Sequence, residues 1–515
     1  MTNKTNKKQS MNRILMLVAM MPAFATAATY YASPDGTGTG SEASPCSLLS
    51  GINKVSKSTN VLILKRGRYA LTGAIGVTGA TANGNYAKIF GETGDPADVI
   101  LDAQGGSEVM RLNKNILVSG VTMMNGCNES STVLHRAAGV RIGYNDTPGT
   151  LSIVSNCVIT CCTNAFTDST KSGTTVVYGG AVCVYDTGLL VDSVVTNNTA
   201  VYRSAGVVMV NGTMRGCTVS DNRAVAGGGG IFCERGSTAY IADSTISGNK
   251  GGTSGDATVG GGVACYFANS SFVLTNCTVA GNSARRGGGV SGGWETALHA
   301  EIVDCIITNN VSTLQGGGVL VRDDNQNDLA TRFVMRNSLV AFNKSEGTNA
   351  SGGGGGVYFA AYANPVIDSC TIVSNKCHSK ASYGGAGIYH RWGGTVTNSI
   401  IAFNVFGSSL ETATAWCLNV GTPSDAYRNC CAWPEASSVF LAENGCVNAD
   451  PKFADAAHGD FTLTKGSPCK NAGIFESWMD GACDLSGKAR VCAGIPDIGC
   501  YELNYTIMGM IISFR

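Results

Sequence analysis

Short segments with alternating apolar and polar positions fill the chain between residues 137 and 404. One kind of segment reads small residue, any residue, Ile or Val, two further residues and Asn, as in STISGN (244–249) and CTVAGN (277–282). The small residue and the branched residue are two apart, so both side chains point to one face of a strand, which we predict to be the core face. The closing asparagines are Asn198, Asn222, Asn249, Asn282, Asn310, Asn343, Asn375 and Asn404, and an earlier copy has Cys162 in that place.

A glycine cluster followed by Val or Ile forms the second kind of segment, which alternates with the first. Examples are GGGI (228–231) and GGGV (260–263), and nine such clusters lie between residues 137 and 388. The Asn-ended copies recur every 24 to 36 residues, and their β-branched composition without a helical period favours strands. The sequence therefore predicts an all-β fold, a parallel β-helix with about three short strands in each coil.

We interpret the repeated asparagines as a structural turn ladder rather than a ligand site. Asn adopts the left-handed backbone conformation of a tight bend more readily than most residues, and stacked amides can hydrogen-bond from coil to coil. The glycines allow positive φ and a close approach of neighbouring coils. The glycine run at 227–230 is one of these turns and not a phosphate-binding loop, because it leads into a strand and lacks a Lys.

The first 27 residues have the layout of a secretory signal peptide. Four basic residues between positions 4 and 13 precede an apolar run (14–24) and a small-x-small cleavage site at 25–27. The apolar run is too short to span a bilayer, and no later stretch reaches that length. We expect export through the Sec pathway and a secreted or cell-surface location, with no transmembrane segment after cleavage.

The charge balance argues against one class of partner. The 515 residues include 36 Lys and Arg against 36 Asp and Glu, and only 14% of the chain is charged. Nothing in this composition indicates nucleic-acid binding. The 68 glycines show no every-third-residue period, so they serve turns or close backbone packing rather than a collagen-like helix.

The 21 cysteines form two main groups. The first group occupies inward positions of the repeats, where we expect inert core thiols: Cys157, Cys217, Cys233, Cys265, Cys277, Cys305 and Cys370. The second group crowds the last hundred residues and, in an exported protein, predicts a disulfide-stapled end whose pairing the sequence leaves open: Cys417, Cys430, Cys431, Cys446, Cys469, Cys483, Cys492 and Cys500.

The alternation of glycine-led and Asn-ended strands over residues 137–404 resembles the repeats of bacterial polymorphic outer-membrane proteins. It is also similar to the wider group of right-handed parallel β-helix proteins that includes pectate lyases. The opening segments TYYASPDGTGTGSEASPCSLLSGI (29–52), LILKRGRYAL (62–71) and KIFGETGDPADVILDAQG (88–105) resemble the opening of secreted β-helix proteins. This resemblance implies a right-handed coil and a capping helix near Ser47–Val55 that closes the N-terminal end.

Five C-terminal motifs resemble the choice-of-anchor module of bacterial surface proteins: NADPKF (448–453), GDFTL (459–463), GSPCKNAG (466–473), DLSGKAR (484–490) and PDIGCYE (496–502). That module closes a β-helix ahead of a surface-anchoring signal, so the resemblance implies attachment to the cell surface. Together these features divide the chain into a signal peptide (1–27), a cap with the first coils (28–110), the repetitive β-helix (111–410), the last coils with the anchor-like module (411–502) and a short tail (503–515).

Outward positions of the glycine-led strands carry aromatic and charged side chains, which suit stacking on sugar rings and hydrogen bonding to hydroxyls or carboxylates. Ordinary strand composition is the competing explanation, since aromatic residues favour sheets. His390 faces inward among them, and we expect a buried histidine with satisfied hydrogen bonds. The candidate ligand-binding residues are Glu234, Arg235, Tyr266, Trp294, Arg322, Tyr389, Arg391 and Trp392.

Glu295, Asp323 and Asp324 are the strongest candidates for catalysis. At matched positions on adjacent coils, Glu295 and Asp324 would approach to about 5 Å, the carboxylate separation of a retaining glycosidase. The oxygens of Asp323 and Asp324 would also suit Ca²⁺, although DDNQND (323–328) lacks the glycine and closing Glu of a calcium loop. A solvated acidic loop is the simpler interpretation, and no other cofactor is expected.

The sequence thus favours an exported protein that binds a polysaccharide or a host or cell-surface glycan along one face of the solenoid, as an adhesin does. The alternative is a polysaccharide lyase or glycoside hydrolase of the pectate-lyase-like β-helix type. Against that alternative, the Gly-His-Gly and Asn-Thr-Asp motifs of pectin-degrading β-helix enzymes are absent. A purely structural role in the cell envelope is a third interpretation.

Overall fold

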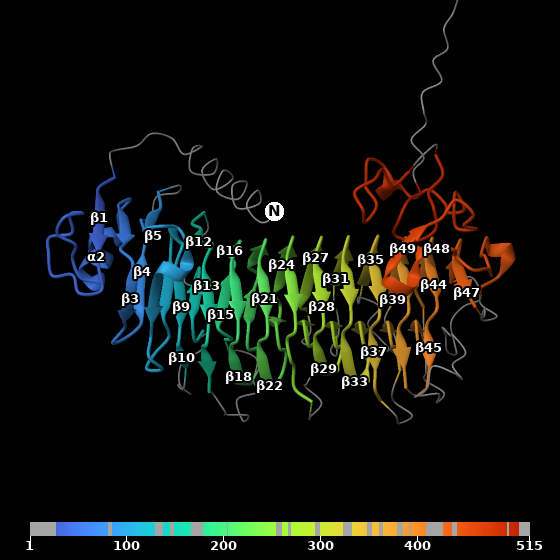
Figure 1. Ribbon diagram of the computed structural model, residues 1–515, viewed down its shortest axis with the longest axis horizontal. Helices are drawn as coiled ribbons and strands as arrows, with labels where there is room; N and C mark the ends of the chain where they lie inside the picture. Colours follow the sequence, from blue (N-terminus) through green and yellow to red (C-terminus); the bar gives the residue numbers. More distant parts are fainter. Residues whose placement is uncertain are drawn as a thin grey trace, which may run out of the picture.

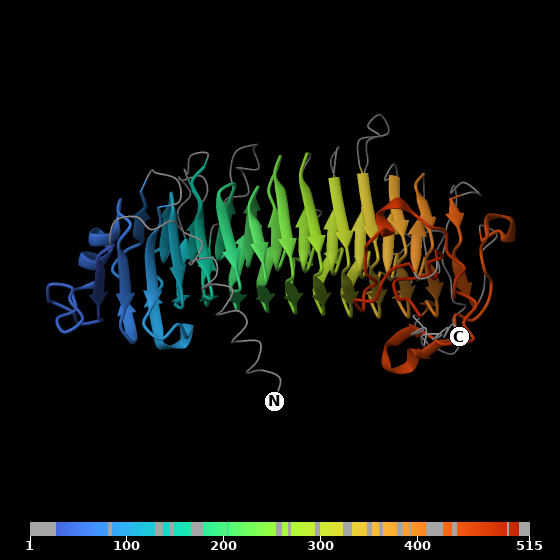
Figure 2. The same ribbon diagram turned by 90° about the horizontal axis from the view of Figure 1, so that it is seen from above.

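The chain winds through stacked coils that follow one another along the long axis of the molecule (Figures 1 and 2). Strands from successive coils pair in parallel, so the computed structural model confirms the predicted parallel β-helix. The structure describes residues 27–80, 85–128, 137–144, 149–165, 179–202, 204–253, 260–265, 269–293, 299–322, 332–347, 353–359, 364–378, 385–390, 393–407, 426–434, 440–491 and 494–503.

Sheet A is the longest sheet in these residues, with 14 strands. Its strands are β1 (Thr29–Ala32), β2 (Val61–Leu64), β5 (Ala87–Gly91), β8 (Ile116–Ser119), β12 (Ser152–Ser155), β16 (Gly188–Val191), β20 (Thr213–Arg215), β24 (Thr238–Ala242), β27 (Ser271–Thr275), β31 (His299–Val303), β35 (Arg332–Arg336), β39 (Asn364–Asp368), β43 (Thr395–Thr397) and β46 (Tyr427–Arg428).

Sheet B contains the Asn-ended segments and, as far as the chain is described, 13 strands. They are β3 (Gly67–Ala70), β6 (Val99–Asp102), β9 (Thr122–Met124), β13 (Val158–Thr160), β17 (Val194–Thr196), β21 (Thr218–Ser220), β25 (Thr245–Ser247), β28 (Thr278–Ala280), β32 (Ile306–Thr308), β36 (Leu339–Ala341), β40 (Thr371–Val373), β44 (Ile400–Ala402) and β47 (Cys431–Trp433).

Sheet C contains the strands that follow the glycine clusters, preceded by two strands of the first coils. They are β4 (Ile75–Thr78), β7 (Met110–Asn113), β11 (Val140–Ile142), β15 (Val182–Tyr185), β19 (Val207–Val210), β23 (Ile231–Cys233), β26 (Val263–Cys265), β30 (Val290–Gly292), β34 (Val319–Val321), β38 (Val357–Phe359) and β42 (Ile388–His390).

A fourth, narrower set of strands lies between sheets B and C in most described coils from residue 127 onward, so the prediction of about three strands falls one short there. Sheet D has two parts, which pair on either side of Lys250. Its inward side chains are small, such as Ala200 and Ala224, which lets this strand lie close to the glycine turn. The strands are β10 (Cys127–Asn128), β14 (Thr163–Asn164), β18 (Thr199–Tyr202), β22 (Arg223–Ala226), β29 (Ser283–Arg286), β33 (Val311–Gln315), β37 (Lys344–Ser345), β41 (Lys376–Cys377) and β45 (Val405–Phe406).

A short helix closes the N-terminal end, as the resemblance implied. Helix α2 (Leu48–Val55) begins after Ser47, whose hydroxyl accepts a hydrogen bond from the Ser50 amide at 3.3 Å. Its buried side chains, Ile52 and Val55, pack on β1 and β2 and so cover the open end of the core. Single 3-10 turns occur at η1 (Pro96–Asp98), η4 (Ala442–Asn444), η5 (Ala456–His458) and η6 (Ser477–Met479).

Every described ladder asparagine is buried, and their side chains form one continuous column. The amide nitrogen of Asn282 donates to the side-chain oxygen of Asn310 at 3.0 Å and to the Ile246 carbonyl at 2.9 Å. The side-chain oxygen of Asn282 accepts from the backbone and side-chain nitrogens of Asn249, both at 2.9 Å. The predicted ladder is confirmed, and its buried polar atoms are satisfied along the stack.

The predicted left-handed conformation belongs to a different residue. It is adopted by the residue before each ladder asparagine, as at Asn197, Asp221 and Asn309, where φ is 55°, 56° and 55°. The prediction for the ladder residues themselves was wrong. The bend is made one position earlier, and this places the next side chain inside the coil, where its amide reaches both neighbouring coils.

The glycine turns are required by the backbone in two ways. Gly287 begins its cluster with φ 61°, a conformation that L side chains rarely adopt. Gly289 has no such φ, but a Cβ atom there would lie 2.6 Å from the Gly318 carbonyl oxygen and 2.9 Å from the Asn310 amide nitrogen. Glycine is therefore needed for the turn at one position and for coil stacking at the other.

A second column of turn residues precedes the small-residue position of sheet B, and the sequence interpretation missed it. Asn276, Asp304 and Asn337 belong to it, with φ of 51°, 55° and 47°. Their side chains also bond between coils: the Asn337 amide donates to Asp304 at 2.6 Å. The sequence signal was present as Asn, Asp, Gly or Ser directly before each inward Cys or Ser.

The C-terminal module folds back against the outer face of sheet B beside the last coils (Figures 1 and 2). Phe461, Leu463 and Ile498 of the module form one apolar cluster with Leu339 and Ile400 of sheet B. The antiparallel pair β48 (Phe453–Asp455) and β49 (Asp460–Leu463) belongs to this module. The module therefore covers the outer face of the final coils rather than extending the solenoid.

The second turn column also holds the module in place. The Asn398 side chain donates to the Ile474 carbonyl at 3.0 Å and accepts from the Ile474 amide at 2.7 Å. The Asn337 and Asn429 side chains donate to the Cys483 and Ala472 carbonyls at 2.9 and 3.2 Å. These bonds join turn side chains of the coils to the backbone of the module.

A buried charge network ties the resembling motifs of the module together. Arg490 is 0% exposed, and its guanidinium lies 2.9 Å from the Glu502 carboxylate. Glu502 accepts hydrogen bonds from the Asp497 amide at 3.1 Å, and its own amide donates to Asp484 at 2.7 Å. The DLSGKAR and PDIGCYE segments thus meet at one point inside the module.

The cysteines of the described chain are thiols in this structure. Burial raises the pKa of Cys157 and of Cys217 to about 12, which confirms the inert core thiols expected at these positions. Six of the eight C-terminal cysteines are described, and Cys417 and Cys492 lie outside the described residues. The expected disulfide-stapled end stays a prediction.

Candidate functional site

Most of the predicted ligand and catalytic residues lie outside the described residues. They are Tyr266, Trp294, Glu295, Asp323, Asp324, Arg391 and Trp392. The approach of Glu295 to Asp324 and the calcium alternative therefore stay predictions. Within the described ranges, no group of three or more His, Cys, Asp or Glu side chains is arranged to hold a metal ion.

The four remaining ligand candidates do not share one exposed surface. Arg235 is exposed and Arg322 is half-buried, but the Glu234 side chain is buried. Tyr389 is only 1% exposed, and its ring stacks on that of Tyr358 at 4.5 Å. The expectation of an exposed ring at Tyr389 was wrong, because the outer face of sheet C is itself packed at this level.

The outer face of sheet C is apolar and covered over much of its length. Cys183, Val208, Phe232 and Ala264 occupy successive outward positions, and all are buried in one cluster. The alternation of sequence placed these side chains on the correct face but did not reveal that the face is covered. His390, on the inner side, meets expectation: it is buried, with its Nδ1 3.1 Å from the Tyr427 hydroxyl.

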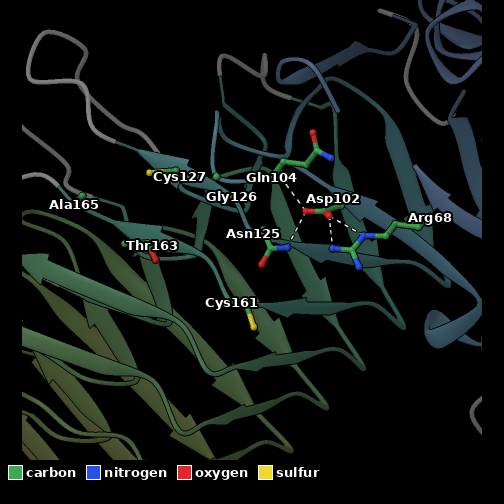
Figure 3. A pocket seen from close by; sticks show the side chains of 10 residues that line it. Arg68, Asp102, Gln104, Asn125, Gly126, Cys127, Cys161, Thr163 and Ala165 are labelled. Atoms are coloured by element: carbon green, nitrogen blue, oxygen red, sulfur yellow. Dashed lines mark hydrogen bonds and ion pairs between the residues drawn. The ribbon is translucent and has the colours of Figure 1, made fainter. Parts of the chain in front are cut away.

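An open groove of about 660 Å³ lies on the outside of the first coils, where sheet B turns toward sheet D (Figure 3). Its polar side chains come from consecutive coils, so they sit side by side although they are far apart in sequence. We call it the N-terminal groove. It is lined by Arg68, Asp102, Gln104, Gly105, Asn125, Gly126, Cys127, Cys161, Thr163 and Ala165.

The groove exists because two repeated features begin there. The chain passes from β6 to β7 without a sheet D strand, and sheet D starts only in the next coil with β10. The asparagine ladder has not begun either, since Gly126 and Cys162 occupy the ladder position in these coils. The corner residues Gln104, Asn125 and Cys161 have φ of 53°, 54° and 55° and form the base of the resulting step.

Asp102 is the buried centre of the groove wall. One oxygen accepts from the Gln104 amide at 2.9 Å and from the Asn125 side chain at 2.8 Å, and the other accepts two bonds from Arg68. Burial opposes ionisation of this carboxyl, but the hydrogen bonds from Gln104, Asn125 and Arg68 outweigh it and lower its pKa. Asp102 is therefore a fixed carboxylate and a poor proton acceptor at neutral pH.

Arg68 presents the other part of its guanidinium to solvent. Its Nε lies 2.7 Å from Asp102 and its Nη2 also contacts that carboxylate, while the side chain is 56% exposed. Nη1 makes no hydrogen bond or ion pair with the described residues. Arg68 is therefore oriented by its two contacts with Asp102, and the remaining N–H donors of its guanidinium can bind a ligand.

A second ionic group lies nearby on the outer face of sheet C. The buried Glu108 carboxylate accepts from the Arg141 Nε and Nη2 at 2.9 and 2.8 Å and lies 3.0 Å from the Arg111 Nε. The Arg141 guanidinium lies 4.9 Å above the Tyr144 ring. Because Glu108 and Arg141 are nearly inaccessible, this group serves the packing of the first coils rather than a ligand.

The comparison with known families agrees with this architecture. A family model described as "Right handed beta helix region" matches residues 164–361. The fold is therefore the right-handed form of the parallel β-helix, as the resemblance implied. No curated protein matches the sequence.

Two solved structures illustrate the likeness. One is a mannuronic acid specific polysaccharide family 6 lyase from human gut microbiota, at 10% identity and a TM-score of 0.35, covering 78% of this chain and 86% of that one. The other is a rhamnogalacturonan lyase, at 11% identity and a TM-score of 0.24, covering 78% of this chain and 87% of that one. At these values neither likeness bears on the activity of this protein.

Proposed function

We propose that the protein is exported and binds acidic polysaccharide on the outside of its β-helix, with the N-terminal groove as an anchoring site. The observation that carries this proposal is the arginine of the groove: Arg68 is fixed by Asp102 yet 56% exposed, with Nη1 directed to no described partner. A sugar carboxylate can take two parallel hydrogen bonds from such a guanidinium. Because the side chain is already ordered, little conformational entropy is lost on binding.

The rest of the lining suits hydroxyl groups. Gln104, Asn125 and Thr163 supply amide and hydroxyl groups along the groove (Figure 3), and its described lining residues include no aromatic side chain. Donors and acceptors of this kind recognise sugar hydroxyls. A groove that is open along its length also accommodates a chain rather than a single small molecule.

The groove favours binding over catalysis because the Asp102 carboxylate is already engaged in hydrogen bonds with Arg68, Gln104 and Asn125. A general base needs a pKa near the working pH, whereas hydrogen bonds lower that of Asp102. The lyase or hydrolase alternative depends on Glu295, Asp323 and Asp324. Attachment through the anchor-like module and export by residues 1–27 complete the proposal, and Arg235 and Arg322 are proposed as secondary contacts on the sheet C side.

Binding of polygalacturonate and of the neutral polymer dextran, measured by affinity electrophoresis and calorimetry, tests the proposal. We expect binding of the acidic polymer that weakens with salt, and a loss of about tenfold or more in Arg68→Ala, since a hydrogen bond to a charged group is worth about 1.5–3 kcal/mol. Arg68→Lys keeps the charge beside Asp102 but not the fork, and should bind with intermediate affinity.

Arg66→Ala is the matched control. Arg66 is 66% exposed, pairs with Asp98 at 3.4 Å and does not line the groove, so its loss should leave binding unchanged. Equal binding by Arg68→Ala, or a preference for dextran, would overturn the proposal. Release of oligosaccharides, with or without Ca²⁺, that disappears in Glu295→Gln or Asp324→Asn would replace it with the enzyme alternative.

A further inference from the structure

Two adjacent cysteines at the end of sheet B point to opposite faces of the sheet and each meets one other thiol. Cys430 belongs to the core of the β-helix, whereas Cys431 belongs to the apolar cluster between sheet B and the C-terminal module. Cys446 lies in the core beside Cys430, and Cys469 lies in the outer cluster with Cys431. This alternation separates four of the eight C-terminal cysteines into two independent pairs.

The inner pair is aligned by backbone pairing. Residues 446–448 run parallel to β47, because the Val447 amide donates to the Cys430 carbonyl at 2.7 Å and the Val447 carbonyl accepts from Ala432 at 3.0 Å. Since Cys431 is the bridge partner of Val447, Cys430 and Cys446 are neighbours in the same register. Directly opposed residues of paired strands have the Cα separation that a disulfide needs. Both thiols lie inside the last coil, where the Cys446 thiol donates to the Tyr427 carbonyl at 3.5 Å and the Cys430 thiol to the Val396 carbonyl at 3.3 Å.

The outer pair links parts of the chain that are far apart in sequence. Cys431 lies on β47, and its thiol donates to the Ala449 carbonyl at 3.3 Å. Cys469 lies in the module, where the Ile498 amide donates to its carbonyl at 2.9 Å. The Cys431 and Cys469 side chains share one apolar cluster, where both are fully buried, and the proximity of Cys431 raises the pKa of Cys469.

We propose that Cys430–Cys446 and Cys431–Cys469 are disulfide sites that lock the C-terminal end of the solenoid after export. The inner bond would close the last coil, and the outer bond would fasten the module to the face of sheet B. The two bonds join residues 16 and 38 positions apart, and a cross-link of this kind stabilises the folded state mainly by restricting the unfolded chain.

The chemistry requires a disulfide donor, such as oxidised glutathione or the disulfide of a thiol oxidoreductase. The neighbouring Cys430 thiol lowers the pKa of Cys446 to about 7, so Cys446 is the attacking thiolate. It forms a mixed disulfide with the donor and releases one donor thiolate. Cys430 then loses its proton and attacks the Cys446 sulfur, which releases the second donor thiolate; the donor is reduced by two electrons and the cysteine pair is oxidised by two.

The outer pair must oxidise before the module has packed, because both thiols are buried in the folded protein. The inner thiol Cys446 is 8% exposed, so the inner bond can also form afterwards. Reduction of the folded protein should accordingly open the inner bond more readily than the outer one.

Peptide mapping of the full chain tests the pairing directly. The protein is folded with a mixture of reduced and oxidised glutathione, remaining thiols are alkylated, and linked peptides are identified without reduction. We expect both linkages. Alkylated Cys430 and Cys446, or Cys431 and Cys469, in the folded oxidised protein would overturn the proposal for that pair, as would linkage to any other cysteine.

A protease assay measures what the bonds do. In the oxidised protein, tryptic cleavage between residues 440 and 503 should slow at least tenfold relative to the reduced protein. Cys431→Ser and Cys469→Ser should each lose this difference, and the double variant should lose no more than either single one. Cys217→Ser is the matched control, because its column neighbours are Ser193 and Ser244 rather than cysteines. An equal cleavage rate with and without the bonds would show that they do not lock the module.

Discussion

The middle of the solenoid and its two ends satisfy buried polar groups in different ways. Between residues 198 and 404, the buried ladder asparagines are neutral, and each repeats the bonding pattern of its neighbour, as with Asn249, Asn282 and Asn310. At the ends the polar groups are charged and occur once, as with Arg68 and Asp102 or Arg490 and Glu502. A column of neutral amides can be extended by adding further coils, because each new asparagine bonds to the one before it. An ion pair satisfies its own two members and offers no such bond to a further coil.

This difference has consequences for stability. A repeated column distributes its stabilising free energy over contacts between neighbouring coils. Substitution of one asparagine therefore affects only its adjacent coils, and the same substitution in another coil should have a similar effect. A single buried ion pair concentrates the effect, because removing one partner leaves an uncompensated charge. The charged pairs at the ends should also make stability depend on pH, whereas the neutral asparagine column should not.

The largest effect is expected for Arg490→Met. Arg490 is fully buried against Glu502, and its loss leaves that carboxylate without its counter-ion. We expect a loss of about 4 kcal/mol in the stability of the module. Hydrogen exchange should rise across residues 484–502 and remain unchanged in the middle coils. Unchanged protection in the module would show that the network is not essential to it.

A smaller but still large effect is expected for Asn282→Asp. The Asn282 amide donates to two acceptors in neighbouring coils, and a carboxylate there would face them without a proton. We expect a loss of about 3 kcal/mol in the free energy of unfolding. Asn309→Asp is the control, since the Asn309 side chain is exposed and donates only to Thr308 among described residues. Similar losses in both variants, measured by urea unfolding, would contradict the ladder argument.

A third comparison separates the two roles of glycine. Gly289→Ala places a methyl group 2.6 Å from the Gly318 carbonyl oxygen, so the coils must move apart, at a cost of about 2 kcal/mol. Gly281→Ala meets only the Gly248 amide nitrogen, at an ordinary contact distance of 3.9 Å, and its cost of about 1 kcal/mol comes from the left-handed backbone. The two variants should differ in urea midpoint in that order, and the reverse order would mean that turn conformation limits the stacking.

The smallest effect concerns the pH dependence of the N-terminal coils. Hydrogen bonds lower the pKa of Asp102 in the folded protein, so its ionised form stabilises the fold at neutral pH, and this contribution is lost as the pH falls from about 4 through the lowered value. Asp102→Asn should be about 1 kcal/mol less stable at pH 7, and the difference should shrink at pH 3. A difference that stays constant with pH would rule out Asp102 as its source.

The sequence predicted the features that repeat. Period-two alternation placed Val207 and Met209 in the core, and the recurring asparagines predicted a stacked column. The sequence-based prediction misplaced the left-handed residue by one position. Asn both tolerates that backbone conformation and forms side-chain hydrogen bonds, and the sequence alone does not show which of the two properties is used at the ladder position. The second turn column escaped notice because its members vary among Asn, Asp, Gly and Ser.

The candidate site was less accessible to sequence reasoning. Arg68 and Asp102 are 34 residues apart and lie in coils without the repeat motif, so no local pattern connects them. The outward positions of sheet C suggested Tyr389 as a ligand contact, but periodicity gives the direction of a side chain and not what lies above it. Pairs of interacting residues that occur only once in the chain can be recognised only when the structure shows which coils and strands lie side by side.

The asparagine column has a direction. The backbone and side-chain nitrogens of Asn198 bond to the side-chain oxygen of Asn222 in the following coil, and this order is kept through Asn404. Each coil is therefore completed by the one synthesised after it, and a growing chain always ends in unsatisfied donors. Pro434 ends the series: it occupies the corner position of Phe403, where φ is 55°, and its ring cannot adopt that angle. A chain that enters an extracytoplasmic space from its N-terminus would add coils one by one in sequence order. Coil addition would end at Pro434, and the residues after it would form the C-terminal module.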